Sequence, residues 1–196
     1  MRLMPALVLG LAVIGCATAE VQRLDLRDPR LPVEARRWLA DAEDEVAIAW
    51  ARMDDSRATL ARLEEYREQQ LGRLEQLRTG PAKVEGEAAA RALGSYADAR
   101  VRLGELELES FKIELELART RLNQARAETA VRYDLKIYEL QPIISEVELL
   151  RNEVADSERR MEEVRTQFEG KAALAWKAYS QYVSKGGTSN ALWSAP

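Results

Sequence analysis

The sequence predicts an all-α protein, built as an elongated antiparallel coiled coil in the form of a three-helix hairpin bundle. Gly (10) and Pro (6) are scarce among its 196 residues, so few positions interrupt a helix. Apolar residues recur with the alternating three- and four-residue spacing that is typical of coiled coils. This pattern runs in three stretches of similar length, which we expect to be helices at about 33–78, 82–132 and 143–184.

The first predicted helix starts after Pro32 and carries one apolar seam. Counting in sevens along it gives two sets of seam positions, of which nine out of twelve are apolar. The first set is Leu39, Val46, Met53, Leu60, Arg67 and Leu74, and the second is Ala42, Ala49, Ser56, Leu63, Gln70 and Leu77. The run stops at Thr79-Gly80-Pro81, because Gly readily caps a helix and Pro cannot continue one. We therefore expect the first turn here.

The second predicted helix carries two seams instead of one. The first contains Tyr96, Ala99, Leu103, Leu106, Ser110, Ile113, Leu117, Thr120, Gln124, Ala127 and Val131, and the other contains Val101, Gly104, Leu108, Phe111, Leu115, Ala118, Leu122 and Ala125. Their mean directions differ by about 140° at 100° per residue. A helix with two apolar faces needs two neighbours, from the same chain or from a second copy. We expect this helix to be the central element.

The third predicted helix follows Pro142, a residue suited to a first helical turn. Its seam is apolar at ten of twelve positions: Ile143, Val147, Leu150, Val154, Ser157, Met161, Val164, Phe168, Lys171, Ala175, Ala178 and Tyr182. No Gly separates Val131 from Pro142, so residues 133–142 form either a turn or a helix kinked at the proline. We favour the turn. Polar seam residues such as Ser110 either specify register or reflect imperfect packing, and we favour imperfect packing.

The N-terminus looks like a targeting signal. Arg2 precedes an apolar run, Leu3 to Ile14, that is too short to cross a bilayer. The run ends in Val13-Ile14-Gly15-Cys16, which resembles the lipobox of bacterial lipoproteins. That resemblance implies that residues 1–15 are a signal peptide and that Cys16 is the lipidated first residue of the mature chain. Two or more acyl chains would hold the protein stably on a membrane.

The same resemblance implies a location in the cell, and the residue pattern predicts the layout of the chain. Ala17 stands where the family's inner-membrane retention signal has Asp, which implies the periplasmic face of the outer membrane. Residues 16–32 carry the lipidated Cys and a tether, 33–184 form the long-helix coiled-coil domain, and 185–196 form a flexible tail. Trp193 in that tail is either unstructured or a docking residue for a partner protein.

Composition argues against an enzyme. The chain has no His, which removes the commonest general base and zinc ligand, and it has no phosphate-binding or nucleophile-elbow motif. The acidic pairs Asp54-Asp55, Glu64-Glu65 and Glu162-Glu163 diverge by about 100° on a helix and are expected to be solvated. A net charge of −4 argues against nucleic acid. We expect no catalytic residue, cofactor, metal or small-molecule substrate.

These features favour a non-enzymatic lipoprotein that acts as a structural spacer or tether in the cell envelope. The layout resembles that of murein lipoproteins, although the chain ends in Ala195-Pro196 instead of Lys, which puts covalent attachment to peptidoglycan in doubt. The alternative is an accessory or scaffold subunit of a secretion, motility or efflux assembly, in which the extra seam of the second helix would complete an oligomer. Residues 118–140 also resemble helices of outer-membrane efflux channels. The expected partners are the membrane, envelope proteins bound through coiled-coil surfaces, and in the alternative a second copy.

Overall fold

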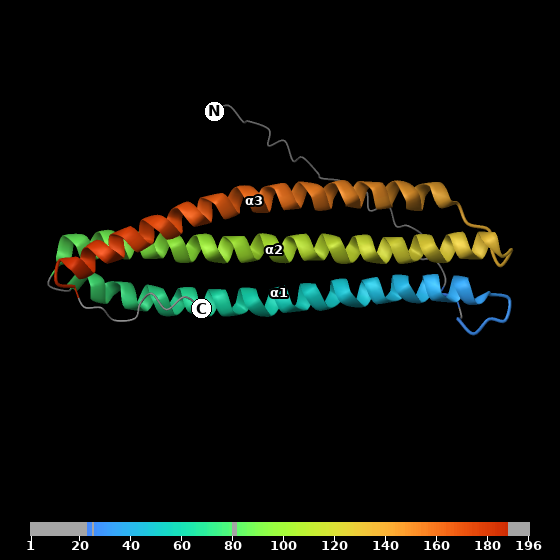
Figure 1. Ribbon diagram of the computed structural model, residues 1–196, viewed down its shortest axis with the longest axis horizontal. Coiled ribbons are helices and arrows are strands. Elements are labelled where there is room, and N and C mark those ends of the chain that lie inside the picture. Colours follow the sequence, from blue (N-terminus) through green and yellow to red (C-terminus); the bar gives the residue numbers. More distant parts are fainter. Residues whose placement is uncertain (1–22, 25, 80–81, 188–196) are drawn as a thin grey trace, which may run out of the picture.

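The computed structural model describes residues 23–24, 26–79 and 82–187. They form three long helices, α1 (Val33–Thr79), α2 (Lys83–Arg132) and α3 (Leu140–Ser184), which lie side by side and antiparallel (Figure 1). At 1.5 Å per residue, their 47, 50 and 45 residues measure about 70, 75 and 68 Å. No strand occurs within these described ranges. The predicted all-α, elongated three-helix hairpin is confirmed.

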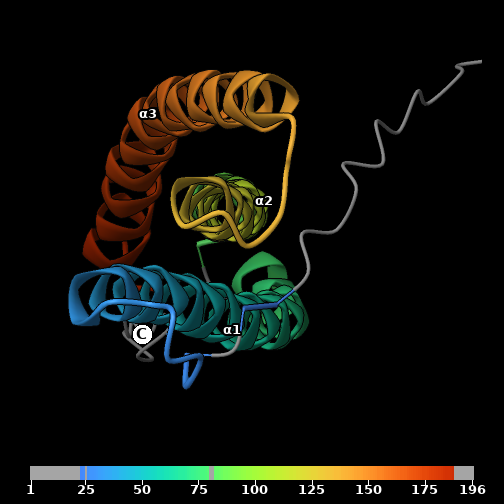
Figure 2. The same ribbon diagram turned by 90° about the vertical axis from the view of Figure 1, so that its right-hand side faces the viewer.

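α2 is the central helix. Both α1 and α3 pack along it, whereas no Cα atom of α1 lies within 8 Å of one in α3 among the described residues. Viewed along the long axis, the two outer helices wind around α2 (Figure 2). The prediction that the second helix is central is confirmed, and the same chain supplies both neighbours.

The two seams of α2 face different helices. Leu108, Leu115 and Ala118 pack with Ala49 and Met53 of α1. Ile113 and Leu117, from the other seam, pack with Val147, Leu150 and Val154 of α3. Gly104 lies on the α1 side, where an added Cβ would meet the Leu63 Cδ1 at 3.0 Å. The small residue allows the close approach of α1 and α2 at this position.

The chain reverses before α1 through a turn at residues 28–31. The amide of Leu31 donates to the carbonyl oxygen of Asp28 at 3.0 Å, and the Asp28 carboxylate accepts from the Arg30 amide at 2.9 Å. Asp at the first position and Pro at the second are typical of such turns. Leu31 is only 1% exposed and packs with Leu39. The described part of the predicted tether therefore packs on the bundle.

A seven-residue turn, 133–139, joins α2 to α3. Asp134 adopts a positive φ of 52°, a conformation that Asp tolerates better than most residues, so the turn needs no Gly. The amide of Leu135 donates to the carbonyl oxygen of Ala130 at 2.8 Å. Helix α3 begins at Leu140, three residues before the expected start, and Pro142 lies in its first turn. Of the two alternatives, the turn is the one present.

Candidate functional site

The predicted lipidation residue Cys16 and the tail residue Trp193 lie outside the described residues. What the structure describes is the body that such an anchor would hold. Its two ends differ. At one end α1 ends, α2 begins and α3 ends; at the other, α1 begins and a turn joins α2 to α3 (Figure 1). We call the first the closed end and the second the open end.

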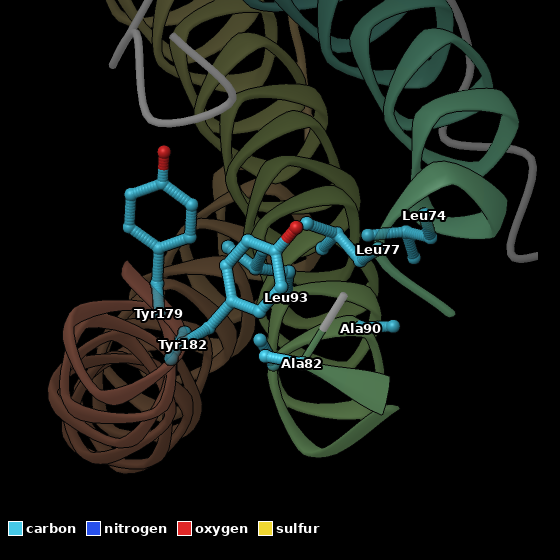
Figure 3. Packing of buried hydrophobic residues seen from close by; sticks show 9 residues of the cluster. Leu74, Leu77, Ala82, Ala90, Leu93, Tyr179 and Tyr182 are labelled. Carbon is cyan, nitrogen blue, oxygen red and sulfur yellow. The ribbon is translucent and has the colours of Figure 1, made fainter. Parts of the chain in front are cut away.

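The closed end has one core shared by all three helices. Its buried members are Leu74, Leu77, Ala82, Ala89, Ala90, Leu93, Ala175, Tyr179 and Tyr182. The ring of Tyr182, 1% exposed, comes from α3 and reaches the side of α2 near Leu77 (Figure 3). A Cβ added at Gly86 would lie 2.0 Å from the Leu77 carbonyl oxygen and 3.3 Å from the Tyr182 ring. Only a glycine permits this approach.

The open end has two separate cores, one on each side of α2. On the α1 side, Leu31, Ala35, Leu39 and Ala125 form a cluster that Leu24, Leu26, Tyr133 and Leu135 extend. On the α3 side, Ala127 and Ile143 form another, with Tyr138 and Leu140. Each of these cores joins only two helices together with a flanking loop.

One narrow stripe of α2 is buried at the closed end and only half-buried along the rest of the rod. It lies between the two seams and consists of residues at seven-residue spacing, Gly86, Leu93, Arg100, Glu107, Glu114, Arg121 and Glu128. Gly86 and Leu93 are buried at the closed end, whereas the five charged residues are half-buried. We call these seven residues the central stripe.

The charged part of the central stripe makes contacts with α1 and with its own helix. Arg100 lies over the Tyr66 ring, 5.8 Å from its centroid, and its Nη1 donates to the Tyr96 hydroxyl at 3.3 Å. Glu114 lies 3.8 Å from Arg52. Burial raises the pKa of Glu114, Arg52 opposes that rise and Glu158 adds to it. Within the described chain the Arg121 Nε has no hydrogen-bond partner.

Ser110 of α2 and Ser157 of α3 form a buried hydrogen bond of 2.9 Å. The Ser157 hydroxyl also donates to the Val154 carbonyl oxygen at 2.8 Å. Since a hydroxyl has one proton, Ser110 is the donor to Ser157. Our sequence interpretation of Ser110 as imperfect packing missed this pairing, because the two residues are 47 positions apart and only the register of α2 against α3 brings them together.

Of the three polar residues that interrupt the α1 seam, Arg67 pairs with a carboxylate of α2. The Arg67 Nε donates to Asp98 of α2 at 2.6 Å, and this carboxylate raises the pKa of Arg67. Gln70 is 5% exposed and Ser56 is half-buried. The Arg67–Asp98 pair and the pair between Arg126 and Glu43 at 3.1 Å place charged groups at the margins of the interface between α1 and α2.

Surface carboxylates behave as the sequence indicated. All six members of the pairs at 54–55, 64–65 and 162–163 are exposed. Asp54 and Glu162 form i,i+3 ion pairs with Arg57 and Arg165. A hollow of about 750 Å³ between α1 and α2 is lined largely by charged side chains, among them Arg67, Asp98 and Arg102. No group of three or more metal-ligating side chains occurs in the described part of the chain.

The exposed aromatic residues lie toward the two ends of the rod. Trp38 and Trp50, 40% and 51% exposed, are on the half of α1 nearest the open end, and Trp176, 54% exposed, is near the closed end. In the described ranges, no helix has an apolar stretch long enough to span a bilayer. No protein-family model, curated protein or solved structure matches this chain.

Proposed function

We propose that this protein is a non-enzymatic lipoprotein in which a lipidated Cys16 anchors a rigid helical rod to a membrane of the bacterial envelope, as a spacer or tether. One observation carries the proposal. The described chain begins at the open end of a rod about 75 Å long, only seven positions after the cysteine of the lipobox-like segment. An anchor placed there would project the closed end away from the membrane.

The body has the properties that a spacer needs. Its three helices are nearly equal in length, and α2 is packed on two sides along its length. The resemblance of residues 13–16 to a lipobox supports lipidation, and Ala17 supports the outer membrane as the address. The charged surface between the helices is consistent with a body that works in water and is anchored by lipid.

The test is metabolic labelling of the full chain with palmitate in a bacterial host. Cys16→Ser should abolish labelling and release the protein from sedimented membranes, because the acyl chains would be its main attachment. Gly15→Ala keeps a small residue before the cysteine and should retain both properties. Labelling of the Cys16→Ser variant would refute the anchor, and so would an unlabelled parent chain.

The second candidate is an accessory subunit of an envelope secretion, motility or efflux assembly. The two seams of α2 no longer favour it, because both are covered within the chain. What favours it is the exposure of Leu174 (63%) near Trp176, away from the open end. Crosslinking of the lipidated protein in cells, followed by mass spectrometry, distinguishes the two. A stoichiometric complex crosslinked through α3 residues 174–176 would favour the accessory subunit over the free-standing spacer.

A further inference from the structure

We propose that the open end is itself a membrane-docking surface, where the turn 133–139 places Ile137 and Lys136 among the headgroups of an anionic lipid bilayer. The inference rests on the proposed function, because it is the lipid on Cys16 that would bring this end to the bilayer. It goes further by assigning the rod an orientation, with the open end against the membrane surface and the closed end pointing away.

The fold explains four of the five large apolar residues between Tyr133 and Leu140 but not the fifth. Tyr133 and Leu135 pack on the α1-side core, and Tyr138 and Leu140 pack on the α3-side core. Ile137 is 94% exposed, so the bundle gains nothing from its side chain. An exposed β-branched residue at the tip of a rod is better suited to an apolar partner than to water.

The neighbours of Ile137 have the chemistry of a bilayer interface. Lys136 is exposed, and its ammonium lies 5.1 Å from the centroid of the Tyr138 ring. An apolar tip beside a cation and an aromatic ring matches the boundary between acyl chains and phosphate headgroups. Val33, 56% exposed at the start of α1, and exposed Arg37 lie at the same end of the rod.

The short distance along the chain from Cys16 to the start of the bundle would place the open end nearest the membrane. From Cys16 to Arg23 there are seven residue steps, which span at most about 25 Å when fully extended. This is about a third of the rod, which measures about 75 Å. A lipid on Cys16 therefore keeps the N-terminal segment near the bilayer, and with it the turn 133–139, whose Tyr133 and Leu135 pack in the same core as Leu24 and Leu26.

Charge alone does not select the open end. Residues 23–37 and 132–139 contain seven Arg and Lys against five Asp and Glu, whereas residues 70–90 and 171–187 at the closed end contain six Arg and Lys against three Glu. Both ends are weakly basic in a chain of net charge −4, so both suit an anionic surface. The closed end is therefore a matched control for the open one.

The experiment places one probe at each end of the lipidated protein. Ile137→Cys and Leu174→Cys alter exposed side chains, and acylation of Cys16 would leave the new thiol as the only free one in the mature chain. Each variant is labelled with an environment-sensitive fluorophore and reconstituted into vesicles of phosphatidylethanolamine and phosphatidylglycerol, with or without acyl chains brominated as quenchers. We expect a blue shift and several-fold stronger quenching at position 137 than at 174.

Each outcome decides between the two proposals. If the protein is lipidated but its two probes respond alike, end-on docking is refuted and the anchor is retained. Equal quenching of both probes would mean that the rod lies flat on the bilayer. A mature chain without acyl groups overturns the proposed function, and the inference with it. Adding Lys136→Glu to Ile137→Cys should reduce the quenching on the anionic vesicles, whereas Lys177→Glu, near the closed end, should not. Equal effects of the two changes would refute a headgroup contact at the turn.

Discussion

The closed and open ends are built from the same three helices, yet they are held together differently. At the closed end Leu77, Leu93 and Tyr182 belong to one core that joins all three helices. At the open end Leu39 and Ile143 belong to cores on opposite sides of α2. Disrupting a core shared by three helices loosens all three, whereas disrupting a core shared by two loosens only those two. A mutation should therefore affect more helices at the closed end than at the open end.

The largest effect is expected from Tyr182→Ala. Removing a fully buried aromatic side chain costs about 3–5 kcal/mol of stability, and this ring lies where α3 meets the other two helices. Leu39→Ala, also at a position only 1% exposed, is the open-end counterpart and should cost about 2–4 kcal/mol.

Hydrogen exchange separates the two variants. Tyr182→Ala should accelerate amide exchange in all three helices at the closed end, whereas Leu39→Ala should do so in α1 and α2 but leave α3 protected. If Tyr182→Ala leaves the amides around Leu74 and Leu77 unchanged, the three-helix core at the closed end does not act as a unit.

A smaller loss is expected from Gly86→Ala. The added Cβ would lie 2.0 Å from the Leu77 carbonyl oxygen, so α1 and α2 must move apart, at a cost of about 1–3 kcal/mol. Gly72→Ala is the control, because nothing lies within 4 Å of its Cβ and the better helix former should add up to about 1 kcal/mol. Thermal melts with opposite shifts support the contact, and equal shifts contradict it.

The Ser110–Ser157 pair should contribute less. Ser110→Ala removes a buried hydrogen bond between α2 and α3, which is worth about 1 kcal/mol. In the double variant Ser110→Ala/Ser157→Ala both partners are gone, so its cost should be smaller than the sum of the two single costs. Chemical denaturation of the four proteins measures this difference. Strict additivity would mean that the pair does not help to fix the register of α3.

The smallest effect concerns pH and Glu114 in the charged part of the central stripe. Its pKa is raised by burial above the ordinary value of 4.5, so the folded protein binds this proton more tightly than the unfolded chain does. The resulting stabilisation is fully present below pH 4.5 and is lost as pH rises through the raised pKa. Glu114→Gln should therefore be neutral or slightly stabilising at pH 7, by about 0.5 kcal/mol or less.

Denaturation across pH checks the sign of that effect. The advantage of Gln over Glu should shrink as the pH falls toward 4. An advantage that grows on acidification would show that the pair with Arg52, 3.8 Å away, outweighs the burial of Glu114.

Much of the helical architecture was predictable from the seams. None of the twelve seam positions in α3 is exposed, and the second seam of α2 identified the central helix, because a helix with two apolar faces has to be covered twice. The seam did not say which neighbour covers which face. Leu108 and Leu115 face α1, an outcome that depends on how the outer helices wind and that no local pattern encodes.

Around the candidate site, the sequence and the fold contribute different parts. The lipobox-like segment and Cys16 come from the sequence and lie outside the described residues. The exposure of Ile137 comes from the structure, because only the folded turn packs Tyr133, Leu135, Tyr138 and Leu140 on the two cores and leaves Ile137 outside them. Leu31 likewise reads as part of a linker in the sequence, and its burial needs the Asp28 turn.

By itself the sequence determined three long helices and their seams, because helix propensity and seven-residue periodicity are local properties; Gly80 and Pro81 of the predicted first turn lie outside the described residues. Only the tertiary structure decided that side chains of α1 and α3 share one core with α2 around Tyr182 at one end and belong to separate cores at the other. The seven-residue repeat looks the same at both ends. The difference lies in how far each outer helix has wound around α2, a quantity that accumulates over the whole rod and is fixed by packing rather than by any single residue.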